Sequence, residues 1–365
     1  MAELDLTVSQ LCGQLIVGGF SGTGLPSSYA SALAEGRRAG AVLFARNIED
    51  ADQVVALNSQ ILEAAGTEAP PLIAVDQEGG RVARLKAPFL KVPPMRRLGE
   101  HDDLGLTRQV AVQMARELSA HGFNLDFSPV MDVDSNPENP IIGDRSFGRD
   151  ARTVMTHGVA FIQGLQQENV LACAKHFPGH GDTALDSHLD LPTVDQPLER
   201  LKRIEIPPFR AASGAGVASM MSAHVVYPAL EPAMPATFSR AACTALLRQE
   251  IGFDGVLFSD DLEMGAIAKH HGVAHAARES IWAGCDVLLI CSDEELQDEA
   301  HAALVKACDD DPRFLERCRE AATRSLRIRR LVPPRVMPER DRRAVLASNE
   351  GLGRLLSELS EEVPA

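Results

Sequence analysis

Eight short apolar runs, separated by longer stretches, constrain the fold of this chain more than any other feature of its sequence. Each run is rich in aliphatic or β-branched residues and has the length of a buried strand. The runs occupy residues 15–20, 41–45, 72–75, 124–130, 170–174, 218–223, 255–258 and 285–291. We predict that each run forms one strand.

The stretches between these runs carry the residue spacing of amphipathic helices. "ADQVVALNSQILEAAG" places its aliphatic residues on one helical face and stops at Gly66. "FSRAACTALLRQEIG" begins at Ser239, a residue type that caps helix N-termini, and stops at Gly252. Strands that alternate with helices form parallel sheets with right-handed crossovers, and eight strands close a (β/α)8 barrel. We therefore predict a single-domain α/β protein with a TIM-type (β/α)8 barrel, and keep a doubly wound open sheet as the alternative.

The domain boundaries follow from where the alternation ends. Residues 1–335 are predicted to form the barrel, and residues 336–365 a C-terminal tail with one short amphipathic helix that packs outside it. A proline-punctuated excursion at residues 85–103 separates the third and fourth strands, and we expect it to form part of a pocket wall.

The composition is that of an acidic globular protein. The chain has 36 Lys and Arg against 51 Asp and Glu, a net charge of −15, which argues against binding to nucleic acid or acidic membrane surfaces. No apolar run approaches the roughly 18 residues of a membrane span, and the N-terminal sequence lacks the pattern of a secretion signal. Seven scattered cysteines without a Cys-x-x-Cys pair indicate reduced thiols. We expect a cytoplasmic protein, and a monomer.

Polar motifs come directly after five of the predicted strands. They are "DQEGG" after the third, "MDVDSN" after the fourth, "KHFPGHGD" after the fifth, "HVVYP" after the sixth and "SDD" after the seventh. In a barrel the carboxyl ends of all strands converge on one face, which carries the active site. We therefore expect these motifs to share one pocket.

Carboxylates and cations dominate these motifs. Asp260 follows an apolar strand and is placed to act as a nucleophile or base, whereas we expect Asp261 to cap the next helix. Asp76 and Arg84 suit a ligand rich in hydroxyl groups, although a local ion pair is the alternative. Arg145 lies in a loop rich in Asn, Pro and Gly, as either a ligand donor or a brace for nearby acids.

The segment "KHFPGHGDTALDSH" at residues 175–188 holds the densest set of reactive side chains. Lys175 and His176 end a strand, and the pair Asp186 and His188 can form a general acid and base, because a carboxylate fixes the tautomer of a neighbouring imidazole. The alternative is that His188 only stabilises the loop. A zinc site is disfavoured, because no His-Glu-x-x-His motif occurs and the cysteines lie elsewhere.

These residues resemble glycoside hydrolase family 3, and within it the short β-N-acetylglucosaminidases of bacterial cell-wall recycling. The ordered motifs "DQEGGRVARL", "IGDRSF", "KHFPGHGDT", "DSH", "MSAH" and "FSDDLEM" carry the resemblance from about residue 20 to residue 330. The resemblance implies a retaining hydrolase with Asp260 as nucleophile and His188, paired with Asp186, as general acid and base. It further implies sugar binding by Asp76, Arg84, Arg145, Lys175 and His176, and no metal or organic cofactor.

A histidine as general acid departs from the usual pair of carboxylates in retaining glycosidases. Without the resemblance, a carboxylate such as Glu78 or Asp182 is the expected acid. The same barrel also leaves open a β-glucosidase, a GlcNAc phosphorylase, a non-catalytic sugar-binding protein, and a metal-dependent hydrolase built on His176, His180 and Asp182.

Overall fold

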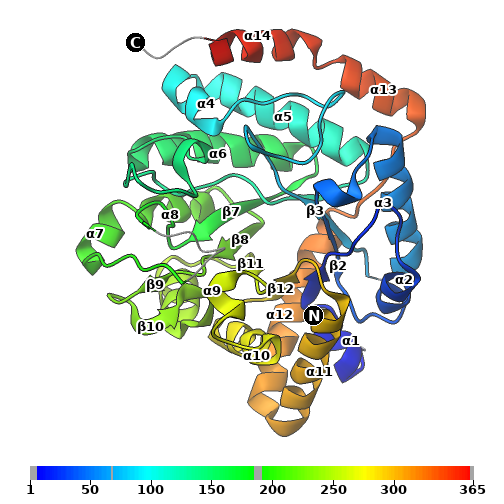
Figure 1. Ribbon diagram of the computed structural model, residues 1–365, viewed down its shortest axis with the longest axis vertical. Helices are drawn as coiled ribbons and strands as arrows, with labels where there is room; N and C mark the ends of the chain where they lie inside the picture. Colours follow the sequence, from blue (N-terminus) through cyan, green and yellow to red (C-terminus); the bar gives the residue numbers. More distant parts are fainter. Residues whose placement is uncertain (1–5, 67–68, 185–190, 362–365) are drawn as a thin grey trace.

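The eight predicted strands close into one parallel barrel. The computed structural model describes residues 6–66, 69–184 and 191–361. Around the barrel the strand order is β1, β12, β11, β8, β7, β6, β3 and β2, which confirms the (β/α)8 prediction and excludes an open sheet (Figure 1). The strands are β1 Ile16–Gly18, β2 Gly40–Leu43, β3 Leu72–Val75, β6 Leu125–Asp126, β7 Leu171–Phe177, β8 Ser219–Ser222, β11 Val256–Asp261 and β12 Val287–Ile290.

Helices surround the barrel, and their ends carry the predicted signals. α3 (Ala51–Ala65) is capped by the Asp50 side chain and ends at Gly66, whose φ of 71° suits glycine. The Ser239 hydroxyl accepts from the Ala242 N–H at 3.0 Å and so caps η4 (Ala241–Glu250), which is a π-helix. The other helices of the outer layer are α1 Val8–Gly13, α2 Ser27–Ala34, α5 Leu104–Ala120, α6 Ala151–Gln167, α7 Leu198–Arg203, α8 Pro207–Gly214, α9 Gly265–Ala268, α10 Val273–Ala283, α11 Glu294–Asp310 and α12 Pro312–Leu331.

Smaller elements decorate the carboxyl ends of the strands. The hairpin of β4 (Gln77–Gly79) and β5 (Val82–Ala83) follows β3, and the pair β9 (Val226–Tyr227) and β10 (Glu231–Pro235) follows β8. Short 3-10 turns are η1 Ala45–Asn47, η2 Gly143–Arg145 and η3 Ala236–Phe238. The two strand pairs carry two of the polar motifs that the sequence places after the strands, "DQEGG" and "HVVYP".

Two apolar layers hold the barrel together. Inside it, Val42, Phe127 and Phe258 belong to one buried cluster, in which the two phenylalanine rings meet edge to face at 5.4 Å. On the outer side Ala41 and Leu43 pack with the helices, because side chains alternate along a strand. All seven cysteines are free and buried. No helix among the described residues has the length and apolarity needed to cross a membrane.

The C-terminal tail forms two helices, α13 (Glu339–Ala347) and α14 (Glu350–Glu361), instead of the single helix predicted. Figure 1 shows them at the top of the molecule, where α13 contacts α5 and α14 contacts α4 (Met95–His101). The Asn349 side chain, between the two helices, donates to the buried carboxylate of Glu117 at 2.8 Å. The two helices pack on α5 and α4 and are separated by residues 348–349.

The tail offers a matched test of its packing. Leu356 on α14 is 0% exposed, whereas its neighbour Leu355 is 42% exposed. We expect Leu356→Ala to lower the free energy of unfolding by about 2–5 kcal/mol, because it empties a packed site. Leu355→Ala should change it by about 0.5 kcal/mol or less. Urea denaturation of both variants measures this, and equal losses would show that α14 does not pack as described.

Candidate active site

A cavity of about 340 Å³ opens at the carboxyl ends of the barrel strands. Its volume lies at the small end of the range of roughly 300–1,000 Å³ that is usual for small-molecule sites. The described candidates from the sequence all line it: Asp76, Arg84, Arg145, Lys175, His176 and Asp260. Apolar side chains complete the wall, among them Phe44, Val82, Phe127, Met221 and Met264.

The expected role of the excursion at residues 85–103 is wrong. No lining residue of the cavity, among those the structure describes, comes from this segment. Its apolar residues pack into the core instead, and the Leu90 N–H donates to Glu117 on α5 at 2.8 Å. The wall on this side is formed by the β4–β5 hairpin, through Val82 and Arg84.

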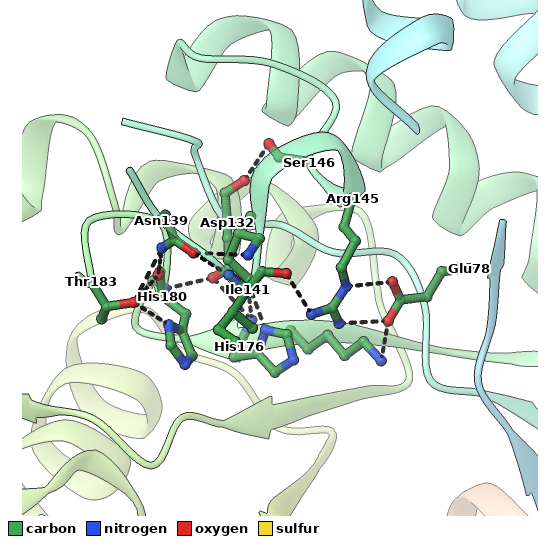
Figure 2. Close-up of polar contacts among 12 residues, drawn as sticks. Glu78, Asp132, Asn139, Ile141, Arg145, Ser146, His176, His180 and Thr183 are labelled. Carbon is green, nitrogen blue, oxygen red and sulfur yellow. Dashed lines mark hydrogen bonds and ion pairs between the residues drawn. The ribbon is translucent and has the colours of Figure 1, made fainter. Parts of the chain in front are cut away.

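A buried ion cluster joins three segments of the chain at the cavity (Figure 2). The Lys175 Nζ lies 2.8 Å from Asp76 Oδ1 and 2.6 Å from Glu78 Oε1. Arg145 forms a bidentate ion pair with Glu78, in which Nε and Nη2 each lie 2.8 Å from one carboxylate oxygen. Burial would raise the pKa of Glu78, but the two cations lower it well below its usual range. Glu78 is thus held as an anion.

The motif "DQEGGRVARL" builds its side of the cluster locally. Gly79 and Gly80 have φ values of 106° and 54°, so only glycine makes this turn without strain. The Gln77 side-chain oxygen accepts from the backbone N–H groups of Arg84 and Leu85 at 2.9 and 3.0 Å, which closes the hairpin. The hairpin brings Arg84 to 3.5 Å from Asp76, so the ion pair kept as an alternative is present in the cavity wall.

Asp132, in the motif "MDVDSN", organises the start of the segment that follows β7. Its fully buried carboxylate lies 2.7 Å from His176 Nδ1 and accepts the backbone N–H groups of His176 and His180. Because Asp132 contacts Nδ1 of His176, the ring nitrogen that does not contact Asp132 is Nε2. The His176 side chain lines the cavity. Asn139 also donates to the backbone oxygen of His180, at 2.9 Å, which ties this segment to the loop that carries Arg145.

Asp260 and Asp261 end β11 with different surroundings. Asp260 lines the cavity, and its Oδ1 accepts the N–H of Asp261 at 2.8 Å. Asp261 accepts from the N–H groups of Glu263 and Cys291. It therefore closes a turn, and the prediction that it caps the next helix is wrong, because the N-cap of α9 is Met264. His224, in the motif "HVVYP", forms a hydrogen bond with Thr237 Oγ1 through Nδ1 at 2.8 Å. Its Nε2 lies 3.0 Å from the carbonyl oxygen of Asp261.

The surroundings of Asp260 and Asp261 shift their pKa values in opposite directions. Burial would raise the pKa of Asp260, but His224, His176, the Asp261 N–H and Lys175 lower it below its ordinary value. For Asp261 burial dominates and raises the pKa to about 7. At neutral pH Asp260 is therefore an anion facing the cavity, the state that a nucleophile or base needs.

Asp186 and His188 lie outside the described residues, so their predicted pairing stays a prediction. The alternative acid Asp182 is engaged elsewhere, since its carboxylate accepts from Gln196 at 2.7 Å and from Arg200 at 3.3 Å. The described residues His176, His180 and Asp182 do not bring their ligand atoms together as a metal cluster would. This geometry disfavours the metal-dependent alternative.

Sequence reasoning underrated four residues near the cavity. The sequence suggests Glu78 only as a possible acid and His180 only as a possible metal ligand. It assigns no role to His224, and it offers Asp132 only as part of the motif "MDVDSN". Each follows a strand directly or within a few positions, so the rule that strand ends carry function could have marked them. Each has at least one partner 37 or more residues away in sequence, which no local pattern reveals.

Comparisons with known proteins identify the family of this chain. The family described as "Glycosyl hydrolase family 3 N terminal domain" matches residues 7–327, and the chain belongs to that family. It is a glycoside hydrolase of the β-hexosaminidase group. A β-hexosaminidase of Thiobacillus denitrificans is 44% identical over 271 residues, which is 73% of this chain and 74% of the relative.

Two solved structures extend the match to three dimensions. A family 3 β-N-acetylglucosaminidase from Paenibacillus sp. superposes with a TM-score of 0.89 at 37% identity, over 98% of this chain and 68% of that one. NagZ from Neisseria gonorrhoeae, solved with N-trifluoroacetyl-D-glucosamine, superposes with a TM-score of 0.79 at 33% identity, over 96% and 98% of the two chains.

The ion cluster predicts a pH-dependent stability. Because the pKa of Glu78 is lowered in the folded state, its ionisation stabilises the fold above the unfolded pKa of about 4.3. This contribution is lost as the pH falls from there through the folded pKa. Glu78→Gln should lower the free energy of unfolding by about 3–5 kcal/mol at pH 7, since it leaves buried cations unpaired.

Urea denaturation of the wild type and Glu78→Gln between pH 7 and pH 3 measures this, and the difference should shrink below about pH 4.3. Glu100→Gln, which removes an exposed partner of Arg97, is the control and should cost about 0.5 kcal/mol or less. A difference that stays constant across this pH range would contradict the assignment of the Glu78 charge.

Proposed function

We propose that this protein is a retaining exo-β-N-acetylglucosaminidase that removes terminal, non-reducing GlcNAc from muropeptides derived from peptidoglycan. The observation that carries the proposal is the Asp260 carboxylate, held as an anion at a strand end beside a cavity lined with polar and charged groups. The N-acetyl sugar derivative in the N. gonorrhoeae relative supports the choice of sugar.

In the first step of the proposed reaction, an Asp260 oxygen attacks the anomeric carbon as the bond from that carbon to the leaving oxygen breaks. His188, oriented by Asp186, gives its proton to the leaving oxygen. In the second step His188 takes a proton from water, whose oxygen attacks the anomeric carbon and releases Asp260. An anionic Asp260 also stabilises the oxocarbenium character of both transition states.

The ion cluster supplies the proposed sugar-binding groups. Asp76 accepts hydrogen bonds from sugar hydroxyls, while Lys175 and Arg84 donate to hydroxyl oxygens. His176 offers its Nε2 on the same wall, and Arg145 fixes Glu78 and with it the position of Lys175. A small cavity fits one terminal sugar better than a long polymer, which agrees with exo action.

Other features of the proposal follow from these steps. They use only side chains and water, so the proposal includes neither a metal nor an organic cofactor. We propose that the barrel, residues 1–335, carries catalysis and that residues 336–365 stabilise it without forming a domain. We further propose that the enzyme acts as a monomer in the cytoplasm, where muropeptides are recycled.

The test of this function is p-nitrophenol release from its β-N-acetylglucosaminide and its β-glucoside, with EDTA present and phosphate absent. We expect a strong preference for the N-acetyl sugar. Asp260→Ala should lower turnover roughly 10³-fold or more, because it removes the nucleophile. Asp254→Ala is the matched control, since Asp254 lies exposed near the other end of β11 and pairs with Arg327.

Three outcomes would contradict the proposal. Release only when phosphate is added would identify a phosphorylase, and equal release from both sugars would remove the N-acetyl specificity. Near-normal turnover in Asp260→Ala would remove that residue as nucleophile.

The acid role of His188 has its own signature. His188→Ala should slow hydrolysis of substrates with poor leaving groups, such as GlcNAc disaccharides, far more than hydrolysis of the p-nitrophenyl glycoside, because p-nitrophenolate leaves without protonation. The ratio of kcat/KM for the two substrates, in the variant and the wild type, measures this. Equal losses on both substrates would count against general acid catalysis by His188.

A further inference from the structure

Three cysteine sulfurs converge outside the active-site cavity. Cys12 lies on α1, Cys308 on α11 and Cys318 on α12, and the exposed fraction of each is at most 4%. Their sulfur atoms all lie within 4.8 Å of one another, and those of Cys12 and Cys308 are 3.7 Å apart. Among the described residues this is the only group of three or more His, Cys, Asp or Glu side chains that converges in this way.

The spacing of the sulfurs fits a shared metal ion. A metal bonded to three sulfurs at about 2.3 Å in a trigonal plane holds them about 4.0 Å apart. One pair of sulfurs is 3.7 Å apart and no pair is more than 4.8 Å apart, so small side-chain movements bring the sulfurs to this spacing. Ordinary core packing accounts for one buried cysteine, but it does not require three sulfurs from three different helices to meet.

The chemistry of the three side chains favours a soft cation. The sulfurs of Cys12 and Cys308 lie within hydrogen-bonding distance of each other, and either thiol can be the donor. Thiols lose their protons when they bind a metal, and the resulting thiolates are soft anionic ligands for a thiophilic cation.

We propose that Cys12, Cys308 and Cys318 form a binding site for a soft monovalent cation, Cu(I). Thiolate ligands select Cu(I), zinc or iron–sulfur clusters. Structural zinc almost always takes four ligands, and the described residues supply three at this site. Binding is not a redox step: copper–sulfur bonds form, and any thiol proton that is displaced passes to solvent.

The site links the two ends of the barrel sequence. α1 precedes β1, whereas α11 and α12 follow β12, and the three helices lie together at the lower right of Figure 1. β1 and β12 are neighbours in the sheet, so the ion would sit behind the seam where the barrel closes. Cu(I) should therefore raise the melting temperature, since only the folded chain brings the three sulfurs together and so binds the ion more tightly than the unfolded chain.

The experiment is an anaerobic titration of the full chain with Cu(I), in the presence of a phosphine reductant and the competing chelator bathocuproine disulfonate. We expect one Cu(I) per chain, ultraviolet thiolate-to-copper absorption, and a higher melting temperature. Cys318→Ser should weaken binding by at least the roughly 10–100-fold that loss of an outer-shell partner costs. Cys243→Ser, at another buried cysteine, is the matched control and should bind like the wild type.

Several results would overturn the proposal. They are failure of the wild type to take Cu(I) from the chelator, equal binding by Cys318→Ser and the wild type, and retention of Zn(II) but not Cu(I). p-Nitrophenyl glycoside hydrolysis and circular dichroism report whether each variant folds. If Cys318→Ser does not fold, Cys308→Ser tests the same site, and the wild-type titration decides independently of both variants.

Discussion

The interaction on which this active site depends is the buried contact of Lys175 with Asp76 and Glu78. An unpaired ammonium group at 3% exposure would be costly, because its loss of hydration is not compensated. The carboxylates of Asp76 and Glu78 pair with the ammonium group, and the Arg145 guanidinium in turn pairs with Glu78. The cluster thereby joins the end of β7, the hairpin after β3 and the loop before α6. Each of these segments needs the other two in place to bury its charge.

The surroundings of Asp260 explain why it is an anion. Burial would raise its pKa, but His224 and His176 lower it most, the Asp261 N–H that it accepts lowers it further, and Lys175 of the ion cluster adds to this effect. For Asp261, one residue later, burial dominates and the carboxylates of Glu263 and Asp260 add to it, so the pKa rises to about 7. The two adjacent carboxylates thus differ because of groups that the fold brings to them, not because of their own sequence.

This dependence marks the limit of prediction from the sequence. The barrel was predictable because the apolar runs that form its strands can be counted in the sequence. Helix ends were predictable because residues such as Gly66 and Ser239 mark them locally. Asp76, Arg84, Lys175 and Asp260 were predictable because they follow strands whose carboxyl ends must converge. Glu78 and Asp132 were not recognised as supports, since their partners are far away in the chain. The excursion at residues 85–103 was misplaced because its prolines indicate a loop without saying which surface covers it.

Asp132 extends the same logic to the end of β7 and the residues directly after it. Its carboxylate receives the ring and backbone N–H groups of His176 and the backbone N–H of His180, and it belongs to the strand-end loop after β6. Burial would raise its pKa, but these histidines lower it, so the anion persists and keeps accepting all three bonds. Asn139 also binds His180, through the His180 backbone oxygen. Residues 176–180 are therefore held by Asp132 and Asn139, two side chains of the barrel face. The imidazole of His176, which lines the cavity, keeps its orientation only while Asp132 accepts its ring N–H.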